Sequence, residues 1–301
     1  MKFKKFVNFI VLIMIVSVVF SACEKSDNDE NETVSVSETQ TVNTPTSDIT
    51  NPSSAEPISS DNEEITAQTK VQTTKETTTQ RKSVSVTIPE GYSFMQIAKT
   101  LESKNICTAK EFYKAAQSYK VKSFTIPSSS NRCFKLEGYL FPDTYEFYEN
   151  EEPVTVIRKM LNNYAAKSGM PTDKELIIAS IIEKEVRSDS HMKMVSSVFH
   201  NRIKKGMKLE SDPTREYVND YITGNSLLSG NTSKYAALYN TYKCKLPAGP
   251  ICSPGARAIA AAKNPASSDY LYFFFGNDNT NHYSKTYEEH KEQMEKYGVS
   301  Y

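Results

Sequence analysis

Residues 176–214 constrain the fold more than any other stretch, because their pattern predicts two amphipathic helices joined and followed by turns. In the first helix Ile178, Ile182 and Val186 recur at helical spacing, and Glu185 falls inside the same apolar face. A carboxylate at the edge of a core-facing stripe loses water, so its pKa should rise toward the range that a general acid needs. Glu185 is therefore the first candidate for a catalytic residue.

The second helix of the pair carries Arg202 on its apolar side, and Gly206 predicts its end. A half-buried Arg needs an acceptor, and a carboxylate or a polar substrate would serve. Residues 210–214 should then turn, because Pro213 biases Asp212 away from helical angles. The residues alone leave two interpretations open: a catalytic neighbourhood, or a helical hairpin held by one internal ion pair.

The amino-terminal residues predict the cellular location of the protein. Residues 1–22 combine a lysine-rich start, a short apolar run and small residues before Cys23, which is typical of an export signal. The string Ser-Ala-Cys resembles a bacterial lipobox, in which the signal is removed and Cys23 carries a lipid. Without cleavage, the same run would be a short membrane anchor. Both alternatives predict anchoring to the outer face of the bacterial cytoplasmic membrane.

Residues 23–82 predict a lipid-anchored disordered tether. From Glu24 to Lys82 there is no aromatic residue, and 12 acidic residues face only 5 basic ones. Such a segment cannot bury enough apolar surface to offset the entropy lost on ordering. A core can therefore form only from the rest of the chain.

Composition of the remaining residues 83–301 excludes several classes of protein. The segment holds 28 basic and 24 acidic residues, a mild excess that suits an anionic polymer, with no basic run interleaved with aromatics. Nucleic acid is therefore not expected as a partner. Neither cysteines nor histidines show metal-ligand spacing, so we predict no metal and no cofactor. The cysteines could form two disulfides or remain free: Cys107, Cys133, Cys244 and Cys252.

Residues 83–125 predict a small subdomain. Residues 83–88 alternate as a strand, and two capping boxes, Ser93 with Gln96 and Thr108 with Glu111, begin helices at about 93–103 and 108–119. This strand–helix–helix unit resembles a LysM-type glycan-binding fold.

Residues 136–147 interleave aromatics and carboxylates around a bend at Gly138 and Pro142. Aromatic rings stack on pyranoses and acids accept their hydroxyls, so this stretch could form a sugar platform with Glu137, Tyr139 and Asp143. An edge strand with ordinary core aromatics is the alternative.

The rest of the chain predicts mostly helices. We expect a helix at 153–167, a capping box at Thr172, a loop with short helical pieces at 219–237, and a stiff loop at 246–251. A helix at 254–263, a hairpin from 270–275 with 282–285, and a last helix capped by Thr286 complete it. The predicted class is α+β: the LysM-like subdomain, then a mixed α/β domain over 126–301 with a central helix pair and a C-terminal β-hairpin.

Six ordered motifs carry a family resemblance: EGYLFPDTYEF, ASIIEKE, SVFHNRIKKGMKLESDPT, YNTY, LPAGPI and DYLYFFF. Together they closely resemble the MltG (YceG-like) endolytic murein transglycosylases over about residues 84–297. The resemblance implies a lyase that cuts the MurNAc–GlcNAc β-1,4 bond of nascent peptidoglycan strands without water and leaves 1,6-anhydroMurNAc ends. It maps the catalytic glutamate onto Glu185. The expected substrate-binding residues are Glu137, Tyr139, Asp143, Asn201, Arg202, Ser211, Asp212, Tyr239 and Asn240.

Other functions stay open from the sequence. Asp212 could be the second carboxylate of a hydrolytic muramidase, and a wall-binding lipoprotein without activity is a further alternative. Glu210 departs from the Gln usual in the family. The expected partners are peptidoglycan glycan strands, the membrane, and cell-wall synthases or elongation and division proteins.

Overall fold

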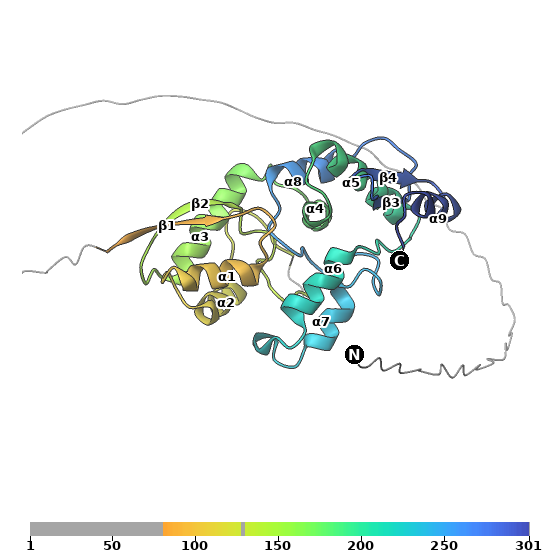
Figure 1. Ribbon diagram of the computed structural model, residues 1–301. Helices are drawn as coiled ribbons and strands as arrows, with labels where there is room; N and C mark the ends of the chain where they lie inside the picture. Colours follow the sequence, from red (N-terminus) through yellow and green to blue (C-terminus); the bar gives the residue numbers. More distant parts are fainter. Residues whose placement is uncertain (1–80, 128–129, 301) are drawn as a thin grey trace, which may run out of the picture. The chain divides into compact units, whose positions relative to one another are not determined.

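The computed structural model describes residues 81–127 and 130–300 (Figure 1). The predicted signal, the lipid site at Cys23 and the tether lie outside these residues, apart from the last two residues of the tether. Within the described part, no helix combines the length and the apolar character that crossing a bilayer requires.

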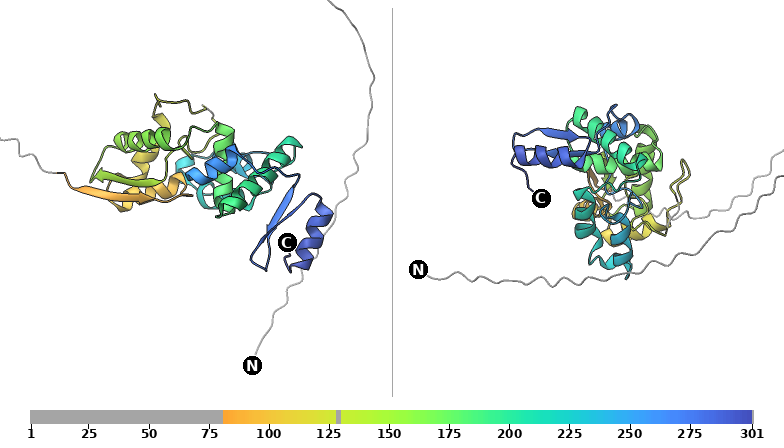
Figure 2. Two further views of the ribbon diagram at one scale, coloured as in Figure 1. Left: turned by 90° about the horizontal axis from the view of Figure 1, so that it is seen from above. Right: turned by 90° about the vertical axis from the view of Figure 1, so that its right-hand side faces the viewer.

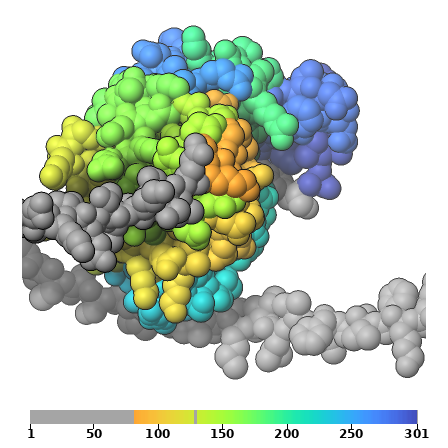
Figure 3. Space-filling view, turned by 90° about the vertical axis from the view of Figure 1, so that its left-hand side faces the viewer, coloured from red at the N-terminus to blue at the C-terminus, as the bar shows by residue number. Residues whose placement is uncertain are grey.

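The first layer joins a two-stranded antiparallel sheet to three helices. Its elements are β1 (Ser83–Ile88), α1 (Phe94–Ser103), α2 (Ala109–Ser118), β2 (Asp143–Tyr148) and α3 (Pro153–Lys167). Both predicted capping boxes are formed, at Ser93 and at Thr108. β1 pairs along its whole length with β2, and α2 packs on α3. Figure 3 shows the orange, yellow and light-green residues of this layer together on one face of the molecule. The layer therefore extends past the boundary predicted at residue 125.

The central helix pair is formed by α4 (Asp173–Glu185) and α5 (Asp189–Lys204), with α8 (Ala256–Lys263) packed on both. Gly206 follows α5 with φ of +70°, as expected for a helix stop. The amphipathic prediction for α4 is wrong, since every residue from Leu176 to Ile182 is buried. The reason is that α5, α6 and α8 all pack against this helix.

Two helices follow Glu210, where the sequence predicted a turn and then a loop with short helical pieces. They are α6 (Asp212–Tyr217), continued by the π turn η1 (Val218–Ile222), and α7 (Thr232–Tyr239), with the 3₁₀ turn η2 (Ser226–Leu228) between them. Pro213 lies in the first turn of α6. A proline is tolerated there because the first backbone N–H groups of a helix have no partner within it. The prediction that Pro213 makes a turn is therefore corrected: it begins a helix.

The C-terminal hairpin is confirmed. β3 (Tyr272–Phe275) pairs antiparallel with β4 (Asn281–Ser284), and α9 (Tyr287–Lys296) follows a capping box at Thr286. Figure 2 shows the hairpin and α9 side by side at one edge of the described part.

The four cysteines among the described residues are all free thiols: Cys107, Cys133, Cys244 and Cys252.

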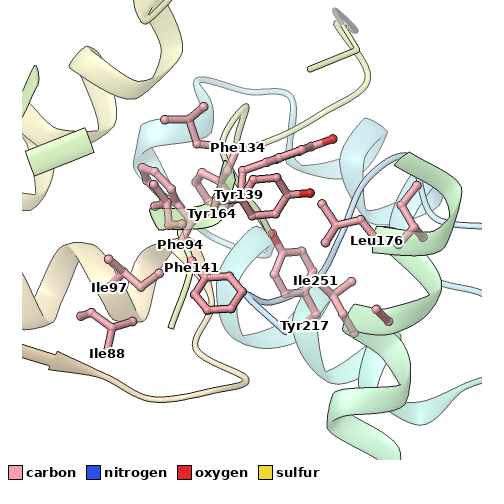
Figure 4. Close-up of a cluster of buried hydrophobic side chains, with 14 of the residues drawn as sticks. Ile88, Phe94, Ile97, Phe134, Tyr139, Phe141, Tyr164, Leu176, Tyr217 and Ile251 are labelled. Atoms are coloured by element: carbon pink, nitrogen blue, oxygen red, sulfur yellow. The ribbon is translucent and has the colours of Figure 1, made fainter. Parts of the chain in front are cut away.

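The stretch 136–147 belongs to the core, which corrects the expectation of a sugar platform. In β2 the side chains alternate, so that Tyr145 and Phe147 are buried while Glu146 is exposed. Tyr139 is also buried, and Figure 4 shows it among Phe94, Phe134 and Tyr164. Phe94 stacks on Phe134, and Tyr139 packs against Tyr164, so these rings are core aromatics. The alternative reading, core aromatics on an edge strand, is the correct one.

Gly138 turns this stretch with φ of +84°, and a Cβ there would lie 2.5 Å from Cβ of Pro250. Gly138→Ala should therefore lower the free energy of unfolding by about 2 to 5 kcal/mol, through backbone strain and overlap together. Gly230, with φ of +78° and no atom within 4 Å of its Cβ position, is the matched control. Gly230→Ala should lose only about 1 to 2 kcal/mol. Equal losses in denaturant unfolding would contradict the close approach to Pro250.

Candidate active site

Glu185 is the last residue of α4, and the chain leaves the helix at Val186 in an extended conformation. Its carboxyl group is partly buried, and burial raises its pKa to about 7. The negative charges of Asp212 and Glu216 raise the pKa further, while a hydrogen bond from Ser211 lowers it. A group with this pKa can both give and take a proton near neutral pH.

Ser211 holds Glu185 in place, because its hydroxyl donates to Oε1 of Glu185 at 2.6 Å. Ser211 is itself only 3% exposed, and two buried threonines fix its backbone. Its N–H donates to the Thr241 hydroxyl at 2.9 Å, and its carbonyl accepts from the Thr214 hydroxyl at 2.6 Å. The two threonine hydroxyls lie 2.8 Å apart. The turn after α7 therefore sets the position of the Glu185 partner.

Asp212 lies next to Ser211 at the surface and is held by two neighbours. It accepts a hydrogen bond from the Tyr242 hydroxyl at 2.7 Å and pairs with Arg215 at 3.0 Å. Tyr242 is 41% exposed, and the Arg215 guanidinium lies 5.4 Å from the centre of its ring. An exposed ring beside the acid offers the stacking surface that residues 136–147 do not.

Arg202 is buried, as predicted, but its acceptors are mostly backbone carbonyls. It donates to the carbonyls of Lys208, Leu209 and Leu271, and it pairs with Glu210 at 3.1 Å. Arg202 therefore does not contact Glu185. Instead it fixes the segment that leads into Ser211, which makes it a positioning residue.

Three other residues predicted to bind substrate serve the scaffold. Tyr239 is fully buried and its ring packs against that of Tyr217, so it cannot reach a sugar. The Asn201 amide donates to the carbonyls of Ser268 and Tyr270, and the Asn240 side chain accepts from the backbone of Tyr242. These amides are occupied in holding the chain beside β3 and in the turn after α7.

The residues predicted between 137 and 143 have other partners within the protein than Glu185. Glu137 is 1% exposed and accepts from the Phe94 N–H and the Tyr217 hydroxyl. Tyr139 donates to Asp173, and Asp143 pairs with Lys167. Glu137 thus ties the start of α1 to α6 inside the protein, and burial keeps Glu137 and Tyr139 from direct contact with a sugar. Asp143 is half-buried at the start of β2, and its predicted role in substrate binding stays a prediction.

Glu183 is the other carboxylate near the end of α4, and its pKa is also raised by burial. It accepts from the Gly255 N–H at 3.0 Å, so it faces the loop before α8. Gly255 passes so close that a Cβ there would overlap Glu90. Glu183 therefore has a structural partner, whereas Glu185 is held by one side-chain hydroxyl.

Sequence reasoning missed Thr214, Thr241 and Tyr242. All three lie within motifs that were identified, ESDPT and YNTY, yet a motif does not say which of its side chains point inward.

A small cavity of about 40 Å³ lies beside the site between Lys184, Glu216 and Ser93. The larger cavity, about 460 Å³, lies at the far ends of α1 and β2, near Cys107 and Glu151. In the described part, no three His, Cys, Asp or Glu side chains are grouped to hold a metal ion.

The chain is similar to proteins of the YceG-like family. A model of the YceG-like family matches residues 55–296. The chain is 32% identical over 238 residues to a Bacillus subtilis protein named endolytic murein transglycosylase, covering 70% of this chain and 64% of that protein. A Streptococcus pneumoniae protein of the same name is 33% identical over 218 residues, covering 62% and 40%. The chain thus spans less than two thirds of either relative.

A solved structure supports the fold. The crystal structure of a YceG-like protein from Listeria monocytogenes, at 2.6 Å, superposes with a TM-score of 0.58 and 30% sequence identity. The match covers 69% of this chain and 75% of that chain. The mixed α/β arrangement of helices and small antiparallel sheets is therefore shared.

The contacts of Glu185 predict opposite pKa shifts in two variants. Ser211→Ala removes the hydrogen bond that stabilises the ionised form, so the pKa of Glu185 should rise above about 7. Asp212→Asn removes a nearby negative charge, so the pKa should fall. An NMR titration of the labelled carboxyl carbon measures both. Asp269→Asn, which changes an exposed carboxylate outside the site, should leave the titration unchanged. Shifts of the same sign in the first two variants would contradict the assignment.

Proposed function

Because the chain belongs to the YceG-like family, we propose that it is an endolytic peptidoglycan lytic transglycosylase. It would cut the β-1,4 bond between MurNAc and GlcNAc within nascent glycan strands and leave 1,6-anhydroMurNAc ends. The observation that carries this proposal is Glu185, a partly buried carboxyl group with a pKa raised by burial to about 7 and a single side-chain donor in Ser211.

In the proposed reaction one carboxyl group acts twice. Protonated Glu185 donates its proton to the glycosidic oxygen as the bond from C1 to that oxygen breaks. The carboxylate then takes the proton of the MurNAc C6 hydroxyl while its oxygen bonds to C1. Glu185 ends protonated, no water is consumed, and the cycle can repeat. A pKa near neutral serves both steps, because neither the acid nor the base is held in its unreactive form.

A hydrolytic muramidase would need a second carboxylate to activate water or to attack C1. Asp212 is the candidate, but its carboxylate is engaged by the Tyr242 hydroxyl and by Arg215. Both contacts are made to the same oxygen of Asp212, so that oxygen is occupied. They favour an electrostatic role for Asp212, which keeps the Glu185 pKa high, over a role as nucleophile.

Digestion of purified peptidoglycan followed by mass spectrometry tests the proposal. The protein should release fragments with anhydro ends, and Glu185→Gln should lower turnover by about 10²-fold or more while strand binding persists. Glu183→Gln is the matched control, because Glu183 is also partly buried but faces Gly255. It should keep activity within a few-fold of the parent.

Other results of the digestion would assign the protein a different function. Reducing ends in place of anhydro ends would identify a hydrolase. Strand binding without any cleavage, by the parent and by both variants alike, would identify a wall-binding protein.

We further propose that Cys23 is lipidated, that residues 23–82 tether the enzyme to the outer face of the cytoplasmic membrane, and that the LysM-like unit of β1, α1 and α2 helps to bind glycan. Support comes from the export-type amino end and the aromatic-free acidic segment. Cell-wall synthases and elongation or division proteins are the proposed partners.

Anchoring is tested by membrane fractionation and by incorporation of a labelled fatty acid. The parent should sediment with membranes and carry the label, and Cys23→Ala should lose the label. If the variant still sediments without label, the apolar run itself is the anchor. If neither protein sediments, the membrane location is wrong.

A further inference from the structure

Five exposed lysines lie on two chain segments that meet beside Tyr242. They are Lys204, Lys205, Lys208, Lys243 and Lys245. We call them the lysine patch. Three come from the end of α5 and the segment after it, and two come from the turn after α7.

Two contacts hold the contributing segments together. The Lys208 ammonium donates to the Tyr242 carbonyl at 2.9 Å. A Cβ at Gly206 would lie 3.5 Å from the Lys245 ammonium, so this side chain lies over the end of α5. The patch is therefore a feature of the packed structure, built from residues about 40 positions apart.

The patch has no counter-charge of its own. None of its five lysines forms an ion pair within residues 81–127 and 130–300, and Glu210, the acidic residue that follows Lys208 and Leu209, is paired with Arg202. Lys204 and Lys205 gain some stability from the negative end of the α5 dipole. Lys243 and Lys245 lie beyond the last turn of α7, where that effect has faded. Like charges gathered without partners attract an anionic ligand.

The patch adjoins the catalytic groups through Tyr242. The Tyr242 carbonyl accepts from Lys208, its hydroxyl donates to Asp212, and the neighbouring Ser211 donates to Glu185. A polymer that stacks on Tyr242 would therefore extend over the lysines. A flat membrane that bound the same lysines would cover the active site. The charge of the patch and its position beside the site therefore favour a glycan strand over a membrane as its ligand.

We propose that the lysine patch binds the carboxylates of the stem peptides that the glycan strand carries. The proposal rests on the proposed function and specifies the substrate, namely strands that keep peptides with free carboxylates. Each MurNAc carries its lactyl peptide outside the sugar chain, so these anions repeat along the strand. Lysine suits them, since a flexible point charge tolerates carboxylates whose positions vary, whereas arginine would demand a fixed geometry.

The test uses a charge-reversed variant, Lys204→Glu with Lys243→Glu, which changes one lysine in each segment. Lys291→Glu with Lys296→Glu is the control, because it reverses two exposed lysines on another element, α9. Binding of fluorescent uncrosslinked strands is measured in the Glu185→Gln protein, and KM and kcat for cleavage are measured in the active one. A second strand preparation has its carboxylates converted to neutral amides.

Patch reversal should weaken binding and raise KM about tenfold on the native strands at low ionic strength, with little change in kcat. On the amidated strands the patch-reversed variant should bind as the parent protein does. The control variant should match the parent on both native and amidated strands.

The proposal is overturned if patch reversal leaves native-strand binding unchanged, or weakens binding to native and amidated strands equally. It is also overturned if the variant loses binding only to anionic phospholipid vesicles, which would assign the patch to the membrane. Because binding is measured in the inactive protein, a failure of the proposed chemistry leaves this test intact.

Discussion

The Glu185 carboxyl group loses most of its water at the end of α4, and the rest of the site is arranged around that one desolvated group. α5, α6 and α8 pack around α4 and bury its residues from Leu176 to Ile182. Arg202 then fixes the segment that leads to Ser211, and the Thr214–Thr241 pair fixes Ser211 itself. Burial raises the Glu185 pKa, and the Ser211 hydrogen bond keeps the rise moderate.

The raised pKa of Glu185 also makes the stability of the folded protein depend on pH. The pKa of Glu185 is about 7 in the folded protein and 4.5 when unperturbed. The folded state therefore holds this proton more tightly, so the contribution to stability is full below pH 4.5 and is lost as the pH rises to about 7. At neutral pH much of this contribution to the stability of the folded state is lost, as is common where a site requires a group with a perturbed pKa.

Local signals predicted the elements well, because they depend on neighbouring residues only. The capping boxes at Ser93, Thr108, Thr172 and Thr286 all form, and Glu185 was identified from helical spacing. Tertiary packing decided what the sequence could not. Whether the aromatics at 136–147 face sugar or core depends on β1 and α1 covering them, and the direction of Tyr239 against Tyr242 depends on where α7 ends. A motif identifies the right turn, but only packing selects which of its side chains reaches the site.

The pH dependence of kcat/KM for strand cleavage tests the central claim most directly, since that quantity reports the ionisation of the free enzyme. If a partly buried Glu185 must hold its proton in order to protonate the glycosidic oxygen, kcat/KM should be level below neutral pH and fall tenfold per pH unit above about 7. A profile that stays level to pH 9, or that already falls near pH 4.5 as for a solvated carboxylate, would contradict the account.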